Sequence, residues 1–237
     1  MRMLIHFELD EVCPDRADVL RRIGIASGDQ VSTGIETLVQ EASALFQQRA
    51  LPAAIWQDIT ADDFEEVYEG ERDNAPETPL EEIVPRADAL ALFAATLGRP
   101  VDDTIRGMFD RGDPALGYVL DVTAGCAAEQ LAQLIADRFA AAAGQPGAPE
   151  MRALAYSPGY CGWHVSGQRA LFEHIQPVEL GLGLTSSCLM DPVKSVSGVL
   201  VAGAPAIHAF RPTFGFCDAC RTHACRARIA GVQRKRR

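Results

Sequence analysis

The chain has 237 residues, 48% of them hydrophobic, and a formal net charge of −10 at pH 7. This length and composition suit one large domain or two small ones with a sizeable core. The acidic balance argues against nucleic acid as the main partner, and no apolar run approaches the ~18 residues that a membrane-spanning helix needs.

The first part of the chain is predicted to combine helices with short strands. Apolar residues at helical spacing, with start and stop signals, mark helices at 13–24 and 32–50. Residues 53–59 and 64–70 are expected to be short strands. The acidic, Pro-rich segment 70–88 is predicted to cross the surface or to mark a boundary.

The central part is predicted to be largely helical. Residues 89–98 form a continuous apolar run that suits either a buried strand or a helix. An amphipathic helix is expected over 101–113, and the Ala-rich segment 115–144 favours a long core helix with a candidate break near Gly125. The run "GQPGAP" at 144–149 is the strongest candidate boundary in the chain.

The last third is expected to be rich in short strands. Strands are predicted at 152–160, 182–190, 195–203 and 206–210, with a short helix at 168–175. We therefore expect an α+β fold, in which a largely helical N-terminal part precedes a twisted antiparallel sheet with flanking helices. The predicted segments are an α/β extension (1–85), a helical part (86–149) and an antiparallel β part with a cysteine cluster (150–237).

Charge is distributed unevenly along the chain. Residues 62–82 hold ten Asp and Glu and one Arg, whereas residues 221–237 hold seven Lys and Arg and no acid. The basic tail is either a solvated end or a docking arm for an acidic protein. The N-terminus turns acidic within nine residues, so we expect no signal peptide and a cytoplasmic location.

The seven cysteines are an odd number, and in a reducing compartment they do not favour a disulfide framework. Cys13, Cys126 and Cys188 stand alone in apolar or helical surroundings and are expected in the core. The other four are Cys161, Cys217, Cys220 and Cys225. The last three fall within nine residues, which is poor for core packing and favours a metal site.

Cys161 is the predicted fourth ligand, because it follows a Pro-Gly-Tyr turn that can present its side chain. An all-thiolate set suits a [4Fe–4S] cluster or structural zinc, and plain thiols are the third alternative. His164 and His223 keep the zinc alternative open, since zinc sites often include histidine.

Several motifs of the second half follow one another in a definite order. They are Pro158-Gly159-Tyr160, then Leu184-Thr185 with Ser187, Met190 and Pro192, and finally Ser195-Val196-Ser197-Gly198. In this order they resemble the reactivation domain of cobalamin-dependent methionine synthase. The upstream run "LFAATLGRPVDDTIRGMF" is similar to the helical part of that domain, so the resemblance covers roughly residues 86–210.

The resemblance implies a domain that binds S-adenosylmethionine and docks over cobalamin, so that oxidised cob(II)alamin is reduced and remethylated. It implies that Gly159 and Tyr160 present backbone and ring to the methionine part of the ligand. The candidate cofactor-binding residues are Gly159, Tyr160, Arg152, Ser195, Ser197 and Gly198.

Two departures from the family pattern bear on these implications. The family has an arginine five residues before the tyrosine, whereas this chain has Ala155 there and Arg152 three residues earlier. Loss of a charge-assisted guanidinium–carboxylate pair predicts weak S-adenosylmethionine binding. In addition, Cys161-Gly162-Trp163-His164 replaces the Pro-Ala-Cys-Pro of the family, and a cysteine cluster replaces its helical tail.

These features predict an accessory protein for the reductive reactivation of a corrinoid-dependent methyltransferase, such as a split methionine synthase. A Cys-ligated cluster would serve as electron relay, since iron–sulfur potentials span roughly −700 to +450 mV. The chain lacks the cobalamin-binding Asp-x-His-x-x-Gly loop, so the corrinoid is expected on a partner protein, with a low-potential electron donor as a second partner. The alternatives are a zinc-stabilised, non-catalytic module that binds a corrinoid protein and a stand-alone methyltransferase.

Overall fold

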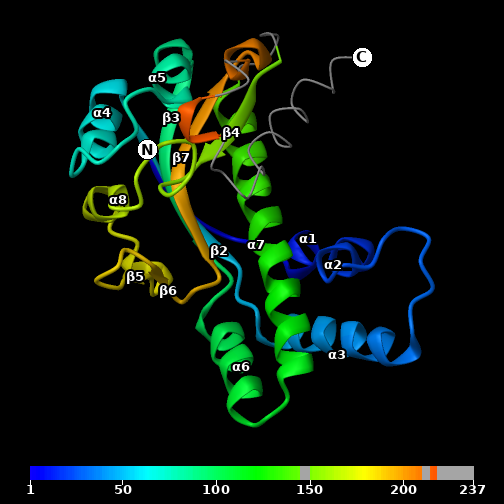
Figure 1. The fold of residues 1–237 in the computed structure, drawn as a ribbon. Helices are drawn as coiled ribbons and strands as arrows, with labels where there is room; N and C mark the ends of the chain where they lie inside the picture. Colours follow the sequence, from blue (N-terminus) through cyan, green and yellow to red (C-terminus); the bar gives the residue numbers. More distant parts are fainter. Residues whose placement is uncertain (145–149, 210–213, 218–237) are drawn as a thin grey trace.

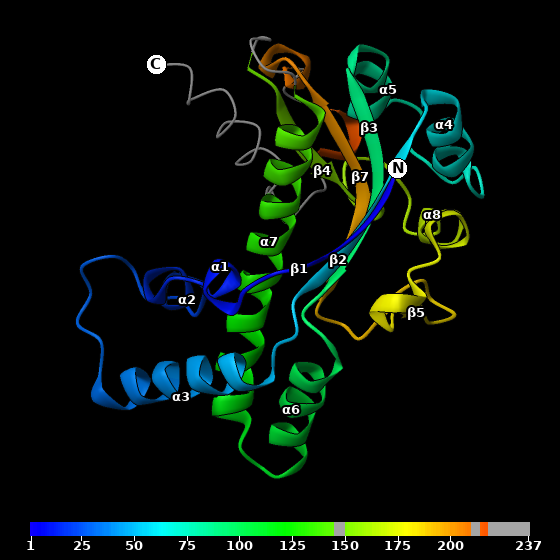
Figure 2. The same ribbon diagram turned by 180° about the vertical axis from the view of Figure 1, so that it is seen from behind.

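The computed structural model describes residues 1–144, 150–209 and 214–217. Within these ranges five strands form one antiparallel sheet in the order β1-β2-β3-β7-β4, with helices on both of its faces (Figures 1 and 2). The α+β class predicted from the sequence is confirmed. The strands are β1 Arg2–His6, β2 Ala53–Ile59, β3 Ala89–Thr96, β4 Arg152–Tyr156 and β7 Ser195–Gly203.

The helices account for most of the remaining described chain. The α-helices are α1 Leu9–Val12, α2 Arg16–Arg22, α3 Thr33–Arg49, α4 Ala61–Glu69, α5 Pro79–Ile83, α6 Arg99–Asp110, α7 Pro114–Ala143 and α8 Gly167–Ile175. Short 3₁₀ helices are η1 Val84–Arg86, η2 Val178–Leu180, η3 Pro205–His208 and η4 Gly215–Cys217, and a small hairpin pairs β5 Gly183–Leu184 with β6 Met190–Asp191. In the ranges described, none of the helices has the length and apolarity to cross a bilayer. The cytoplasmic location stays a prediction.

The central strands β3 and β7 are buried on both faces of the sheet, which explains the continuous apolar run at 89–98. Side chains alternate between the faces of a strand, so Ala91 and Phe93 of β3 join the core beneath α7. Leu90 and Leu92 join a second core, which is covered by α4, α5 and α8. A strand with two buried faces is apolar at every position, and this pattern alone did not separate strand from helix.

Helix α7 is the long helix predicted from the Ala-rich segment, and it continues unbroken through Gly125. Asp113 caps its first turn by accepting a hydrogen bond from the Leu116 N–H at 3.3 Å. A glycine in a helix costs about 1 kcal/mol relative to alanine. The packing of the 30-residue helix α7 stabilises it by more than this cost. Buried alanines of α7 such as Ala124 and Ala127 face a sheet surface that is itself rich in alanine, so helix and sheet pack closely.

Two of the predicted strands are wrong. Residues 64–70 lie mostly in helix α4, where Thr60 and Asp63 form a reciprocal capping box and Phe64 and Val67 share one buried face. Residues 206–208 lie in the 3₁₀ helix η3, which begins at a proline that cannot donate to a strand ladder. The segment predicted as a strand at 182–190 holds only the short strands of the β5–β6 hairpin.

The five-stranded sheet takes strands from all three segments predicted from the sequence. β1 and β2 come from 1–85, β3 comes from 86–149, and β4 and β7 come from 150–237. The three segments therefore share a sheet, and their boundaries stay a prediction. The candidate linker at 145–149 and the basic tail at 221–237 lie outside the described residues.

His208 is fully buried where η3 packs beside β4. Its Nδ1 lies 3.3 Å from the Tyr156 hydroxyl, and its Nε2 lies 3.4 Å from the Arg152 carbonyl oxygen. Burial lowers the pKa of His208, because the charged imidazolium is poorly solvated there. The folded protein thus favours the neutral ring. This contribution to stability is complete above the unfolded-state pKa and is lost as pH falls towards the folded-state pKa.

Candidate functional site

The Pro-Gly-Tyr motif forms a tight turn directly after β4. The Gly159 N–H donates to the Trp163 carbonyl at 2.8 Å, and the Tyr160 N–H donates to the Ser157 carbonyl at 3.2 Å. The backbone φ angle is 88° at Gly159 and 54° at Cys161. Glycine adopts this left-handed region freely, whereas a cysteine does so uncommonly. The turn therefore holds Cys161 in a conformation that the residue does not itself favour.

Trp163 anchors the end of the turn in the core beneath α4 and α8. It is 1% exposed, and its ring centroid lies 5.7 Å from those of Phe64 and Tyr68. The indole lies against Gly167, and its Nε1 has no hydrogen-bond partner among the described residues. Burial raises the pKa of Tyr68 to about 12, and its hydroxyl lies 2.5 Å from Thr78 Oγ1. These surroundings show that Trp163 packs in the core and fixes the end of the turn.

Gly162 clamps the turn to two other parts of the chain. Its carbonyl accepts a hydrogen bond from the Ala75 N–H at 2.9 Å, in the linker between α4 and α5. A Cβ at this position would lie 2.7 Å from both Phe216 Cε1 and Thr78 Cγ2, and φ is 82°. Only glycine fits here without displacing its neighbours. The contact with Phe216 also brings η4 against the turn.

Gly198 of β7 allows the start of the turn to lie close to the sheet. A Cβ on Gly198 would meet the backbone of Tyr156, 2.8 Å from its carbonyl carbon, and would lie 3.1 Å from Ser157 Cα. Tyr156 is the last residue of β4 and pairs with Val199 of β7. The structure thus brings Gly198 together with the Pro-Gly-Tyr turn, although the two are about 40 residues apart in sequence.

The two serines of the Ser-Val-Ser-Gly motif are engaged within the protein. Ser197 is fully buried, and its hydroxyl donates to Gln168 Oε1 of α8 at 2.6 Å. Ser195 Oγ lies 2.9 Å from Thr96 Oγ1 and 2.7 Å from the Pro192 carbonyl oxygen. These bonds attach β7 to α8 and to β3. The cofactor contacts predicted for both serines stay predictions.

The structure does not bring Arg152 to the turn. Arg152 is the first residue of β4 and forms an ion pair with Glu150. Tyr156, at the other end of the strand and next to the turn, lies about 13 Å from Arg152, since a strand rises ~3.3 Å per residue. Ala155, at the position of the family arginine, is 7% exposed and belongs to the core beneath α7. Strand β4 therefore places no guanidinium beside Tyr160.

Tyr160 and His164 flank the anchored part of the turn. Tyr160 is 47% exposed, so the turn presents its ring to solvent. The His164 N–H donates to Asn74 Oδ1 at 2.8 Å, and its Nδ1 lies 2.9 Å from Ser166 Oγ and 3.7 Å from the Asp73 carboxylate. The partners of His164 are thus a second link between the turn and the α4–α5 linker.

Two of the four predicted thiolate ligands fall outside the described residues. Cys161 lies in the turn and is partly buried, and Cys217 is the last residue of η4. Cys220, Cys225 and His223 lie outside the described residues. In residues 1–144, 150–209 and 214–217, no group of three or more His, Cys, Asp or Glu side chains could hold a metal ion. The metal site stays a prediction.

Sequence reasoning missed the residues that hold the turn in place. Asn74 and Ala75 belong to a segment whose composition indicated a surface crossing or a boundary, and Gln168 belongs to no motif. Phe216 directly precedes the cysteine cluster, whose spacing predicted metal binding and gave no sign that Phe216 packs against the turn. No local signal identifies such partners, because each contact joins segments that are distant along the chain.

Comparison with known proteins is consistent with this geometry. The family model described as "Vitamin B12 dependent methionine synthase, activation domain" matches residues 71–212, more than half of the chain. A solved structure of the MetH reactivation domain bound to AdoHcy superposes with a TM-score of 0.64 at 16% identity, over 99% of this chain and 88% of that one. At this identity the likeness establishes the fold. No curated protein matches the chain significantly.

Proposed function

The chain belongs to the family of activation domains of vitamin B12-dependent methionine synthase, and from this premise we propose that it reactivates a corrinoid-dependent methyltransferase. The family match over residues 71–212 carries the proposal, because it spans the turn, α8 and β7 together. The corrinoid is proposed to arrive on a partner protein, since the chain lacks an Asp-x-His-x-x-Gly loop.

Reactivation in this proposal combines one reduction with one methyl transfer. A low-potential donor supplies the electron that converts cob(II)alamin to cob(I)alamin. S-adenosylmethionine then supplies a methyl cation to cob(I)alamin and leaves as S-adenosylhomocysteine. The chain would hold the methyl donor and dock the partner, so that the two reacting centres meet in the right orientation.

We propose that the ligand lies against Gly159 and Tyr160. Both backbone N–H groups are used inside the turn, so the turn offers the Gly159 carbonyl and the exposed Tyr160 ring. A carbonyl oxygen suits the ammonium of an amino-acid moiety. No arginine of β4 reaches the turn to pair with a carboxylate, which supports the expectation of weak binding.

Calorimetry with S-adenosylmethionine and S-adenosylhomocysteine tests this binding site. Tyr160→Ala should reduce affinity at least fivefold for both ligands, since it removes the exposed ring. Tyr118→Ala is the matched control, because Tyr118 on α7 is similarly exposed, at 50% against 47%. Equal affinities for the two variants would show that the ligand binds elsewhere or not at all.

The electron relay is proposed to be a [4Fe–4S] cluster on Cys161, Cys217, Cys220 and Cys225, with structural zinc as the alternative. The contact between Phe216 and Gly162 supports it, because these residues directly adjoin Cys217 and Cys161. Iron, sulfide and zinc should be measured after anaerobic purification. Cys217→Ser should remove the metal, whereas Cys13→Ser, outside the cluster, should not. Metal-free wild-type protein would rule out both alternatives.

The partner proposal has a spectroscopic test that is independent of the metal. Mixing with a cob(II)alamin-loaded corrinoid protein should shift the cob(II)alamin spectrum and accelerate its reduction by a low-potential donor. Charge steering would make the association rate fall as salt rises. An unchanged spectrum and reduction rate across the candidate corrinoid proteins would exclude reactivation in favour of another role for the fold.

A further inference from the structure

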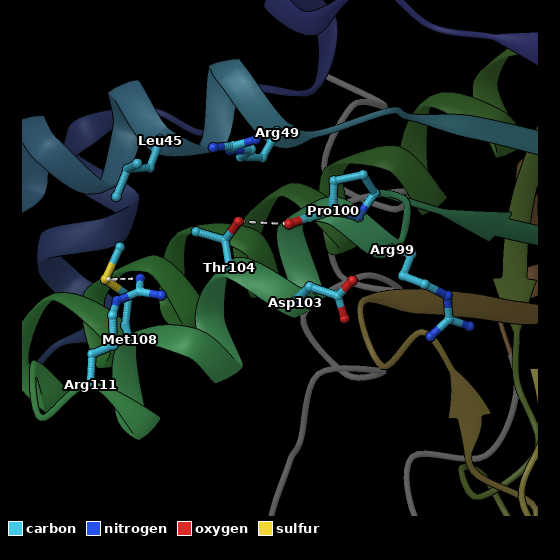
Figure 3. Close-up of a pocket in the computed structure, with 8 residues that line it drawn as sticks. All are labelled: Leu45, Arg49, Arg99, Pro100, Asp103, Thr104, Met108 and Arg111. Atoms are coloured by element: carbon cyan, nitrogen blue, oxygen red, sulfur yellow. Dashed lines mark hydrogen bonds between the residues drawn. The ribbon is translucent and has the colours of Figure 1, made fainter.

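A groove between α3 and α6 lies apart from the Pro-Gly-Tyr turn, and its α6 wall belongs to the run at 92–109 that resembles the helical part of the family domain. Its volume is about 520 Å³, within the range of small-molecule sites. The lining residues are Leu45, Arg49, Arg99, Pro100, Asp103, Thr104, Met108 and Arg111. Figure 3 shows that α3 supplies one wall and that α6, with the residue after it, supplies the other.

The groove is electropositive, although the protein as a whole carries a net negative charge. Three arginines and one aspartate line it, whereas the whole chain has a net charge of −10. Arg99 is neutralised by a two-pronged ion pair with Asp191, at 3.2 and 3.0 Å. Arg49 and Arg111 form no ion pair within the described chain. These two guanidinium groups have hydrogen-bond donors to spare for an anion.

Arg111 is held in position without using its charge. Its guanidinium lies over Gly107, where a Cβ would come within 2.9 Å of Nη1, and its Nη2 lies 3.5 Å from Met108 Sδ. A thioether is only a weak acceptor, so most of the donor capacity of Arg111 stays available. The absent side chain of Gly107 thus creates the space in which the guanidinium rests.

The apolar part of the groove adjoins the charged part. In Figure 3 Leu45 lies over the Met108 end of α6, and Arg49 lies over the end with Pro100 and Thr104. The Thr104 hydroxyl donates to the Pro100 carbonyl at 2.7 Å and so can still accept a hydrogen bond. An apolar surface beside unpaired guanidinium groups suits a ligand that combines an apolar body with an anionic group.

We propose that this groove binds a small organic anion, a carboxylate or phosphate ester. Arg111 at the Met108 end and Arg49 at the Thr104 end supply the guanidinium groups that attract the anionic group, and Leu45 and Met108 contact the apolar body. Asp103 is the opposing charge in the lining and limits the affinity. This site is distinct from the Pro-Gly-Tyr turn, because its lining residues come from α3, α6 and the residue that follows α6.

Phenyl phosphate, benzoate, inorganic phosphate and phenol serve as probes in amide-resolved NMR titrations. Phenyl phosphate or benzoate should shift the amide signals of Leu45, Thr104 and Met108, and whichever binds tighter identifies the ester or the carboxylate as the preferred anion. Inorganic phosphate lacks the apolar ring and phenol lacks the anionic group. Each should therefore bind at least fivefold more weakly than the better of the two organic anions.

Substitutions of Arg49 and Arg111 test whether their guanidinium groups bind the anion. Arg49→Gln and Arg111→Gln should each weaken the better probe about tenfold, and Asp103→Asn should tighten it. Arg21→Gln is the control, because Arg21 lies on α2 and pairs with Asp18 outside the groove. The proposal is overturned if phenol binds as well as the anions, if no groove amide shifts, or if Arg49→Gln and Arg111→Gln bind like the control.

Discussion

Replacing Gly198 with alanine should distort the junction between β7 and the Pro-Gly-Tyr turn. The new Cβ would lie 2.8 Å from the carbonyl carbon of Tyr156 and 3.1 Å from Ser157 Cα. Both are backbone atoms, so no side-chain rotation relieves the overlap. Overpacking of a buried site costs about 1–3 kcal/mol, and a weakened backbone hydrogen bond adds about 1 kcal/mol. We expect a loss of about 3 kcal/mol in unfolding free energy.

Urea denaturation followed by circular dichroism measures this loss, and a thermal scan should show a fall in Tm of roughly 6–12 °C. Gly183→Ala is the matched control: Gly183 also lies in a strand, and an added Cβ there would meet nothing within 4 Å. The control should stay within about 0.5 kcal/mol of wild type. If Gly198→Ala is no less stable than Gly183→Ala, β4 and the turn do not lie against Gly198 as described.

Three further substitutions test other contacts. Gly107→Ala should stabilise α6 by up to about 1 kcal/mol in thermal unfolding, because only the end of the long Arg111 side chain must shift to make room. Ser197→Ala should cost about 1–3 kcal/mol in urea denaturation, since it leaves the buried Gln168 amide oxygen without its donor. Wild-type unfolding free energy should fall as pH drops below the ordinary histidine pKa, because burial lowers the pKa of His208 in the folded state and protonation favours the unfolded chain. His208→Gln should reduce the dependence of the unfolding free energy on pH. If that dependence is unchanged between pH 7 and 5, it arises from groups other than His208.

The amino-acid sequence by itself determined the helices with strong periodicity and the order of the family motifs. Residues 32–50 have apolar side chains at helical spacing and form helix α3 as predicted. The Ala-rich segment forms helix α7 as predicted. These predictions succeeded because a helix depends on residues three and four positions apart, which the sequence displays directly. The Pro-Gly-Tyr turn was equally local, since glycine and proline restrict the backbone wherever they stand.

The tertiary structure decided what lies against each element. Residues 64–69 were predicted as part of a strand, yet they lie in helix α4, whose Phe64 and Val67 pack together into the core on one side of the sheet. The pairing of β3 with β2 and β7 made the ambiguous run at 89–98 a strand with two buried faces. Gly162 and Gly198 are ordinary glycines in the sequence. Their roles come from Phe216 and Tyr156, which only folding brings beside them, because contacts between distant segments leave no periodic signal along the chain.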